Sequence, residues 1–255
     1  TETETSSTLS LIDASGMTLE SRIHTSDGYT RTKEADGSLA EFLRNYAMEP
    51  DQSPVLLYDG SKKRNQKAHV AVFDLPLEHE AEYFWSTKQY DRIAFHFTNG
   101  FDAQYTKWAD GYRIRVNGNN VSWIKSAQPD TSYDSLKDYL RIVFSYAGTA
   151  SMDTEAQPIP LSDLQVGDVF LKGGNPGHVV MVVDLCENAD GKKAFLLAQG
   201  YMPAQQFHVL KNPAHEDDPW YYEDEVTYPF HTPEYTFQKG SLKRLNYGIT
   251  HTAPE

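Results

Sequence analysis

The chain has 255 residues, a formal net charge of -13 and an isoelectric point near 5.1, because 36 Asp and Glu outnumber 23 Lys and Arg. This acidic balance argues against nucleic acid as a partner, since phosphates attract basic surfaces. The single cysteine, Cys186, excludes an intramolecular disulfide, and no apolar run has the length needed to cross a bilayer.

The opening TETETSSTLS is polar and of low complexity, and a flexible N-terminal arm is predicted over residues 1–20. Such an arm could follow a removed signal peptide or a lipid-anchored residue outside this chain. Residues 21–255 show no internal repeat and no break in composition, so we expect them to form a single α+β domain.

The N-terminal half of this domain mixes a short helix with antiparallel strands. Ser38 is a good N-cap, and the apolar spacing behind it predicts an amphipathic helix over 38–48 that Pro50 ends. One or two helical turns are expected within 78–90. Strands are predicted at 55–58, 69–74 and 93–97, and a hairpin at 113–116 and 121–124.

An aromatic row that includes Trp108 follows the turn at Asn99–Gly100. It could form a stacking platform for a sugar, although aromatic residues mostly fill cores. The strongest helix is predicted over 133–147, with Gly148 as its C-terminal glycine and a loop over 149–166.

The stretch 167–205 predicts a hairpin, with apolar strands at 179–183 and 194–198. His178 begins the first strand, and Gln199, Tyr201 and Gln205 end the second. A two-residue turn at Asp190–Gly191 would place His178 opposite Pro203, and a four-residue loop would place it opposite Tyr201. Either turn brings Gln199 near the histidine.

Beyond the hairpin, a strand is predicted at 207–210, followed over 214–233 by an acidic, aromatic coil that wraps the surface with its aromatic side chains tucked in.

A helix with a polar N-terminus, then a strand that begins with histidine, then a strand that ends in a polar residue resembles the papain-like cell-wall peptidases and amidases. In that chemistry a nucleophile at a helix N-terminus is activated by the histidine, which a third residue orients. The resemblance makes His178 the base and Gln199 the orienting residue. The alternative is that His178 simply satisfies backbone groups at the start of a strand.

The nucleophile is the weak point of this resemblance. Ser132 and Ser135 stand where the cysteine is expected, and each is either a nucleophile or an ordinary helix cap. Cys186 lies some 20 Å along the strand from His178, so a structural thiol is expected.

No metal or other cofactor is expected, because the histidines are dispersed without paired spacing. His215 with the acidic run 216–218 could bind a hard cation, but a solvated acidic loop is the simpler interpretation.

Several longer phrases resemble a largely uncharacterised family of bacterial cell-envelope proteins, a domain of unknown function common in Bacteroides-type bacteria. They are DGSLAEFLR, FHFTNGF, KWADGYRI, YAGTASM, GDVFLKGGNPGHVVMVVD and QGYMPAQQFHVLKNP. The resemblance implies an extracytoplasmic protein, in the periplasm or as an outer-membrane lipoprotein, and says little about activity.

The family carries a longer helical segment before FHFTNGF, beginning with a polar run that includes a cysteine. In this chain the corresponding segment is short, with residues 74–80 followed directly by 81–84, and it contains no cysteine. If that cysteine is the family's nucleophile, this chain lacks it.

We therefore expect an α+β fold with a central antiparallel sheet, packed helices, a cleft near His178 and a divergent papain-like architecture. The favoured function is a non-catalytic or weakly active envelope protein that binds peptide or glycan with Tyr201, Gln205 and Trp108. The alternative is a hydrolase of envelope amide or ester bonds, with His178 as general base.

Overall fold

The computed structural model describes residues 11–13, 15–16, 18–45, 74–200 and 208–245. Their main feature is an antiparallel sheet in the order β10-β9-β8-β7-β14-β6, with β1 also paired to β8 and β11 to β9. Its strands are β1 (Tyr29–Arg31), β6 (Gln157–Pro158), β7 (Val169–Lys172), β8 (His178–Asn188), β9 (Lys193–Gln199), β10 (His208–Val209), β11 (Tyr221–Tyr222) and β14 (Leu242–Arg244).

The remaining described strands form two-stranded pairs: β2 (Ala94–His96) with β3 (Asp102–Gln104), β4 (Tyr112–Asn117) with β5 (Asn120–Lys125), and β12 (Phe230–His231) with β13 (Thr236–Phe237). The helices are α1 (Leu19–Arg22), α2 (Leu39–Arg44), α3 (Asp74–Ser86), α4 (Tyr105–Ala109), α5 (Tyr133–Tyr146) and α6 (Thr149–Glu155), with short 3₁₀ turns η1 (Tyr90–Arg92), η2 (Leu161–Asp163) and η3 (Glu223–Glu225).

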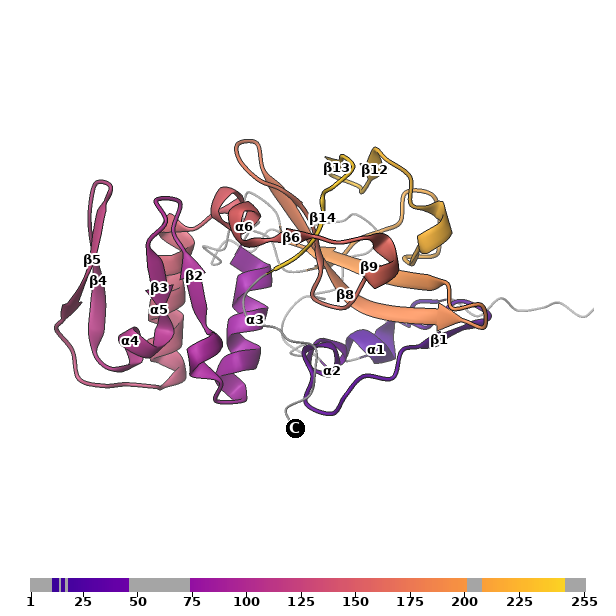
Figure 1. Cartoon of the computed structure of the whole chain (residues 1–255). Helices are drawn as coiled ribbons and strands as arrows, with labels where there is room; N and C mark the ends of the chain where they lie inside the picture. The colour runs from indigo at the N-terminus through magenta and orange to yellow at the C-terminus, as the bar shows by residue number, and fades with distance from the viewer. Residues whose placement is uncertain (1–10, 14, 17, 46–73, 201–207, 246–255) are drawn as a thin grey trace, which may run out of the picture.

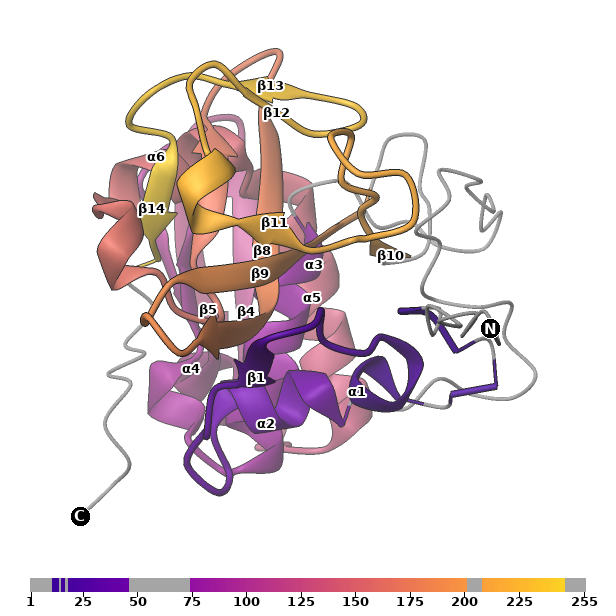
Figure 2. The same ribbon diagram turned by 90° about the vertical axis from the view of Figure 1, so that its right-hand side faces the viewer.

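Figure 1 shows how these elements are arranged. The pairs β2–β3 and β4–β5 stand with α4 and α5 on one side of the molecule, and the large sheet stands on the other, with α3 between them. Turning the view by 90° shows β12 and β13 above strands β8 and β9, and α1 and α2 below them (Figure 2). The expected α+β class with a mainly antiparallel sheet is confirmed.

The hairpin of β8 and β9 is also confirmed. Four residues, 189–192, lie between the two strands, so the predicted two-residue turn is wrong and the predicted four-residue length agrees. Gly191 donates its N–H to the Asn188 carbonyl and has a φ of 73°, a left-handed backbone that glycine adopts without strain. A bulge between Val182 and Asp184 then shifts the pairing by one residue.

Several elements follow the prediction closely. Ser38 caps α2, Ser132 caps α5, and the predicted strand at 93–97 is β2. The predicted hairpin at 113–124 is β4–β5, closed by the two residues Gly118 and Asn119. The buried stripe of α5 consists of Leu136, Tyr139, Leu140 and Val143, as the helical spacing indicates.

Other elements differ from the prediction. Gly148 does not end α5 in a left-handed conformation; its φ is -173° and it is the N-cap of α6, so the predicted loop over 149–166 starts with a helix. The sequence predicts one or two helical turns within 78–90, but α3 is a 13-residue helix that begins at Asp74. Residues 74–80 are therefore part of a helix and not a short connection. The predicted arm is ordered over its described end, where Ile12 pairs with Ile23 and Leu19 is buried.

The predicted strands at 55–58 and 69–74 lie outside the described residues, except that Asp74 begins α3. The predicted strand at 207–210 is present as β10. The acidic coil contains β11, η3 and β12, and it buries Trp220, Tyr221 and Phe230 as expected. No helix in the described part of the chain is long and apolar enough to cross a membrane.

Candidate functional site

The hairpin places His178 and Gln199 on one face of the large sheet. Met181 pairs with Ala198, so Gln199 lies opposite Val180, and His178 two residues earlier points to the same face. The two side chains are diagonal neighbours, and both are buried. The predicted proximity of the histidine and the glutamine is therefore present.

A chain of three side chains begins at the histidine ring. His178 Nε2 lies 2.7 Å from Gln199 Oε1, and Gln199 Nε2 donates to Glu234 Oε2 at 2.7 Å. A carboxylate only accepts, so the amide NH₂ must face Glu234 and the amide oxygen must face the imidazole. His178 therefore carries its proton on Nε2 when the ring is neutral, and Nδ1 is then its basic nitrogen.

The segment that contributes Glu234 also covers His178. The Tyr235 ring is stacked on the imidazole with centroids 4.9 Å apart at 23°, and Phe237 lies against it at 6.1 Å. Only 3% of His178 is exposed. The cleft predicted near this residue is thus occupied by side chains of the β12–β13 segment.

Gly177, the residue before His178, allows the loop before β8 to pack closely against α6. A Cβ at Gly177 would lie 2.1 Å from Thr149 Oγ1 of α6 and 2.4 Å from the Gly174 carbonyl oxygen. The Thr149 hydroxyl itself donates to that carbonyl at 3.2 Å. Gly177 is therefore required because the loop before β8 lies directly on α6.

The two predicted serine nucleophiles lie at the start of α5. Ser132 Oγ accepts from the Ser135 amide at 3.2 Å, and the buried Ser135 Oγ accepts from the Trp108 indole N–H at 3.2 Å. Helix α5 packs on α4 and α3, on the far side of α3 from β8 (Figure 1). These contacts give both serines a capping or packing role and do not bring them to His178.

Replacing these serines tests that role. We expect Ser132→Ala to lower the free energy of unfolding by about 1 kcal/mol through loss of the cap, measured by urea denaturation. Ser135→Ala leaves the indole N–H buried and should cost about 1–3 kcal/mol. Neither variant should change ligand binding. If either variant kept the wild-type free energy of unfolding but lost a hydrolytic activity, that serine would again be the candidate nucleophile.

Trp108, predicted to stack on a ligand, is buried to 5% exposure. Its ring packs edge-on against Tyr139, and the Arg113 guanidinium covers it at 4.2 Å. Core packing is therefore the role its contacts support. Tyr201 and Gln205, the other predicted binding residues, lie outside the described residues.

Cys186 lies on β8, eight residues along the same strand from His178. The thiol is buried, and burial together with the nearby Asp184 charge raises its pKa to about 12. A thiol with a raised pKa is a poor nucleophile, so the expectation of a structural cysteine agrees with its surroundings.

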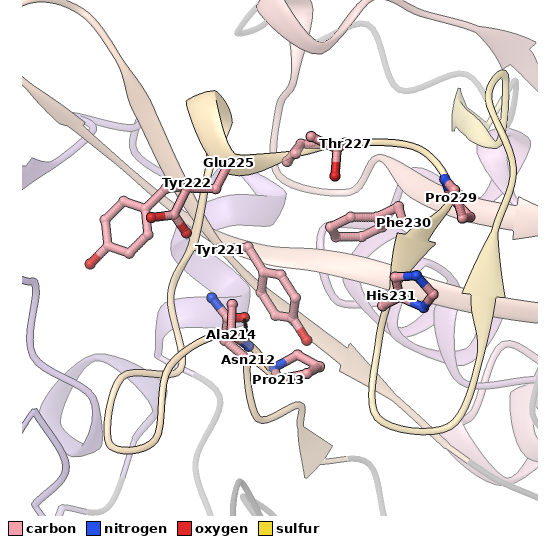
Figure 3. Close-up of a pocket in the computed structure, with 11 residues that line it drawn as sticks. Asn212, Pro213, Ala214, Tyr221, Tyr222, Glu225, Thr227, Pro229, Phe230 and His231 are labelled. Carbon is pink, nitrogen blue, oxygen red and sulfur yellow. Dashed lines mark hydrogen bonds between the residues drawn. The ribbon is translucent and has the colours of Figure 1, made fainter.

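A pocket of about 370 Å³ lies beside this site, between η3 and β12 (Figure 3). The rings of Tyr221 and Phe230 lie at its centre, Pro213 and Thr227 flank them, and Glu225 and His231 lie toward opposite ends. Its volume lies in the range of small-molecule sites.

The pocket and the histidine are connected through one pair of aromatic residues on β12 and β13. Phe230 pairs with Phe237 across β12–β13, and Phe237 contacts His178. The sequence interpretation missed this pocket, as it missed Glu234 and Tyr235. Only the acidic and aromatic composition of 214–233 pointed toward it, and that composition was assigned to a surface coil.

The acidic run next to His215 is the candidate cation site. His215 Nε2 lies 2.7 Å from Glu225 Oε2, while Asp218 accepts from Tyr222 and the Trp220 amide. Within the described ranges no group of three or more His, Cys, Asp or Glu side chains is placed to hold a metal ion.

Comparison with known proteins places the chain in a family. A family model described as a domain of unknown function (4846) matches residues 19–244, which span the sheet, the helices and the pocket. No curated protein and no solved structure matches the chain.

Proposed function

Because the chain belongs to this family of unknown function (4846), whose description assigns no reaction, we propose a function from the site itself. The protein is a non-catalytic component of the cell envelope, outside the cytoplasm, that binds peptide or glycan on a divergent papain-like architecture. Its ligand site is the pocket between η3 and β12 rather than a cleft at His178.

The pocket is the observation that carries this proposal. Aromatic rings with a few polar groups around them are typical of sites that bind peptide side chains or sugar rings. Tyr221 and Phe230 supply the rings, and Glu225, Thr227 and His231 supply the polar groups. All of its lining residues come from one acidic stretch of the chain, between Asn212 and His231 (Figure 3).

The surroundings of His178 support a structural role over a catalytic one. Its ring is hydrogen-bonded to Gln199, stacked under Tyr235 and almost fully buried. A general base must come within about 3 Å of the proton that it removes. To meet a substrate, His178 would have to lose its contact with Tyr235.

A hydrolase remains the second candidate, and one observation favours it. Gln199 Oε1 lies 2.7 Å from His178 Nε2, and a hydrogen bond that fixes the orientation of the imidazole is the role of the third residue in such a hydrolase. This candidate needs a nucleophile that the described contacts of Ser132, Ser135 and Cys186 do not supply.

Retention of envelope material tests the binding proposal. The full chain is immobilised and exposed separately to peptidoglycan-derived peptides, to peptidoglycan glycan strands and to host glycans. We expect one class to be retained by the wild-type protein. Ala214→Trp, which places an indole in the pocket, should weaken retention by at least about ten-fold, because it removes the space that the ligand occupies.

Ala189→Trp is the matched control, since Ala189 is exposed in the β8–β9 loop, away from the pocket. It should retain the ligand as the wild-type protein does. Retention of none of the three classes would contradict the proposed function, and equal weakening by both substitutions would place the ligand elsewhere.

A further inference from the structure

We propose that the pocket between η3 and β12 selects an alkylammonium group, and specifically the lysine side chain of a peptide. This inference rests on the proposed binding function and names its ligand class. It follows from the charge of the segment that builds the pocket, the placement of Glu225, and the nature of the pocket walls.

The charge of this segment is entirely negative. From Asn212 to Gln238 the sequence contains no lysine or arginine. Its acidic residues are Glu216, Asp217, Asp218, Glu223, Asp224, Glu225 and Glu234. A surface with one sign of charge raises the local concentration of ligands of the opposite sign and repels those of the same sign. The pocket therefore favours a cation over a carboxylate or phosphate.

Glu225 supplies the carboxylate that would receive the cation. It lines one end of the pocket, and His215 Nε2 lies 2.7 Å from its Oε2, which fixes the position of the carboxylate. A carboxylate has about four lone-pair sites, so it can accept from an ammonium group while the histidine stays bound. This contact would be a charge-assisted hydrogen bond.

The walls suit the methylene stem of a lysine side chain. The Tyr221 and Phe230 rings meet edge to face with centroids 5.6 Å apart, and Pro213 lies below them (Figure 3). The Tyr221 hydroxyl donates to the Lys211 carbonyl at 2.7 Å, so this residue contributes an apolar ring rather than a donor to the pocket. Apolar and aromatic faces bind an alkyl stem, and the rings also attract its cation.

The opposite end of the pocket can hold the peptide backbone. His231 lies there, with its Nδ1 3.1 Å from Thr236 Oγ1, and the Thr227 hydroxyl lies beside the rings, between the two ends (Figure 3). The remaining ring nitrogen and the threonine hydroxyl are groups that pair with peptide N–H and C=O. The pocket thus offers an acidic end, an apolar middle and a polar end, in the order that a lysine residue of a peptide requires.

Three short peptides that differ at one position test this order. Acetylated and amidated Ala-Lys-Ala, Ala-norleucine-Ala and Ala-Glu-Ala are titrated into the full-length protein, with affinity measured by calorimetry and the site mapped by NMR shifts. We expect the lysine peptide to bind at least about ten-fold more tightly than norleucine, and the glutamate peptide to bind most weakly. The affinity of the lysine peptide should fall as the salt concentration is raised.

Glu225→Gln should weaken binding of the lysine peptide by about ten-fold and leave the norleucine peptide unchanged. Asp190→Asn makes the same change in net charge at the exposed β8–β9 loop and should change neither. Equal affinity for lysine and norleucine, or equal effects of the two substitutions, would overturn the inference.

A parallel titration with a chitooligosaccharide distinguishes failure of the lysine assignment from failure of the proposed binding function. If the sugar shifts Tyr221 and Thr227 resonances and the lysine peptide does not, the alkylammonium assignment fails and the binding function stands. If neither ligand shifts them, both fail.

Discussion

Asp184→Asn is expected to lower the free energy of unfolding by about 3–5 kcal/mol. Asp184 is fully buried on β8, and its carboxylate accepts from Arg31 Nε and Arg44 Nε at 2.7 Å each. Arg44 also donates to the carbonyls of Thr32 and Leu185. Removing this charge leaves Arg31 without its carboxylate partner and leaves Arg44 with only the more distant Glu34 carboxylate, at 3.6 Å, which accounts for the size of the effect.

Urea denaturation monitored by tyrosine and tryptophan fluorescence measures this change. Asp138→Asn is the matched control, because Asp138 pairs with Arg141 on the exposed surface of α5 and should cost less than about 1 kcal/mol. If both substitutions cost the same, Asp184 does not join the N-terminal segment to the sheet as described.

Glu80→Gln is expected to stabilise the protein at alkaline pH. Both Glu80 carboxyl oxygens are buried in α3 without a hydrogen bond to the described residues. Burial raises the pKa of Glu80 to about 8, against a partial opposing effect of the Arg92 charge. The folded protein therefore holds a proton that the unfolded chain releases near the ordinary glutamate pKa of 4.5.

The direction of the pH effect follows from this proton. The contribution of Glu80 to the free energy of unfolding is fully present below pH 4.5, and it is lost progressively as pH rises through about 8. Glutamine cannot ionise, so the variant should equal the wild-type protein at pH 4.5 and exceed it above pH 8 by an amount on the order of 4 kcal/mol.

The difference between Glu80→Gln and the wild-type protein is measured by urea denaturation from pH 4.5 to 9. Taking the difference cancels the contributions of the neighbouring Glu78 and His79. Their pKa values are also shifted by burial, upward to about 7 and downward to about 4 respectively. Glu216→Gln, at an exposed position, should show no such trend. A constant difference across this range would mean that Glu80 ionises normally.

Much of the fold could be predicted where periodicity or turn chemistry is strong. The apolar stripe of α5, its Ser132 cap and the hairpins at Gly118 and Gly191 each follow from local physics. Helix α6 could not be predicted, because its sequence TASMDTE carries no apolar period and its position depends on contact with the loop before β8.

The candidate site likewise contains residues that could be predicted from the sequence and residues that could not. His178 and Gln199 are neighbours because one hairpin brings them together, and the sequence contains that hairpin. Glu234 and Tyr235 are about 35 residues further along and reach the site only because the chain folds back over the sheet. Long-range packing of this kind leaves no local pattern. The serine nucleophiles were placed by analogy with another architecture, and the packing of α5 does not support them.

The most direct test of the central claim is mass spectrometry of envelope peptides and glycans after incubation with the full-length protein and with His178→Ala. The binding account predicts that ligands retained by the wild-type protein are recovered intact, and that Ala214→Trp, not His178→Ala, weakens their retention by at least about ten-fold. Hydrolysis products formed by the wild-type protein and absent with His178→Ala would contradict that account and establish His178 as the base of a hydrolase.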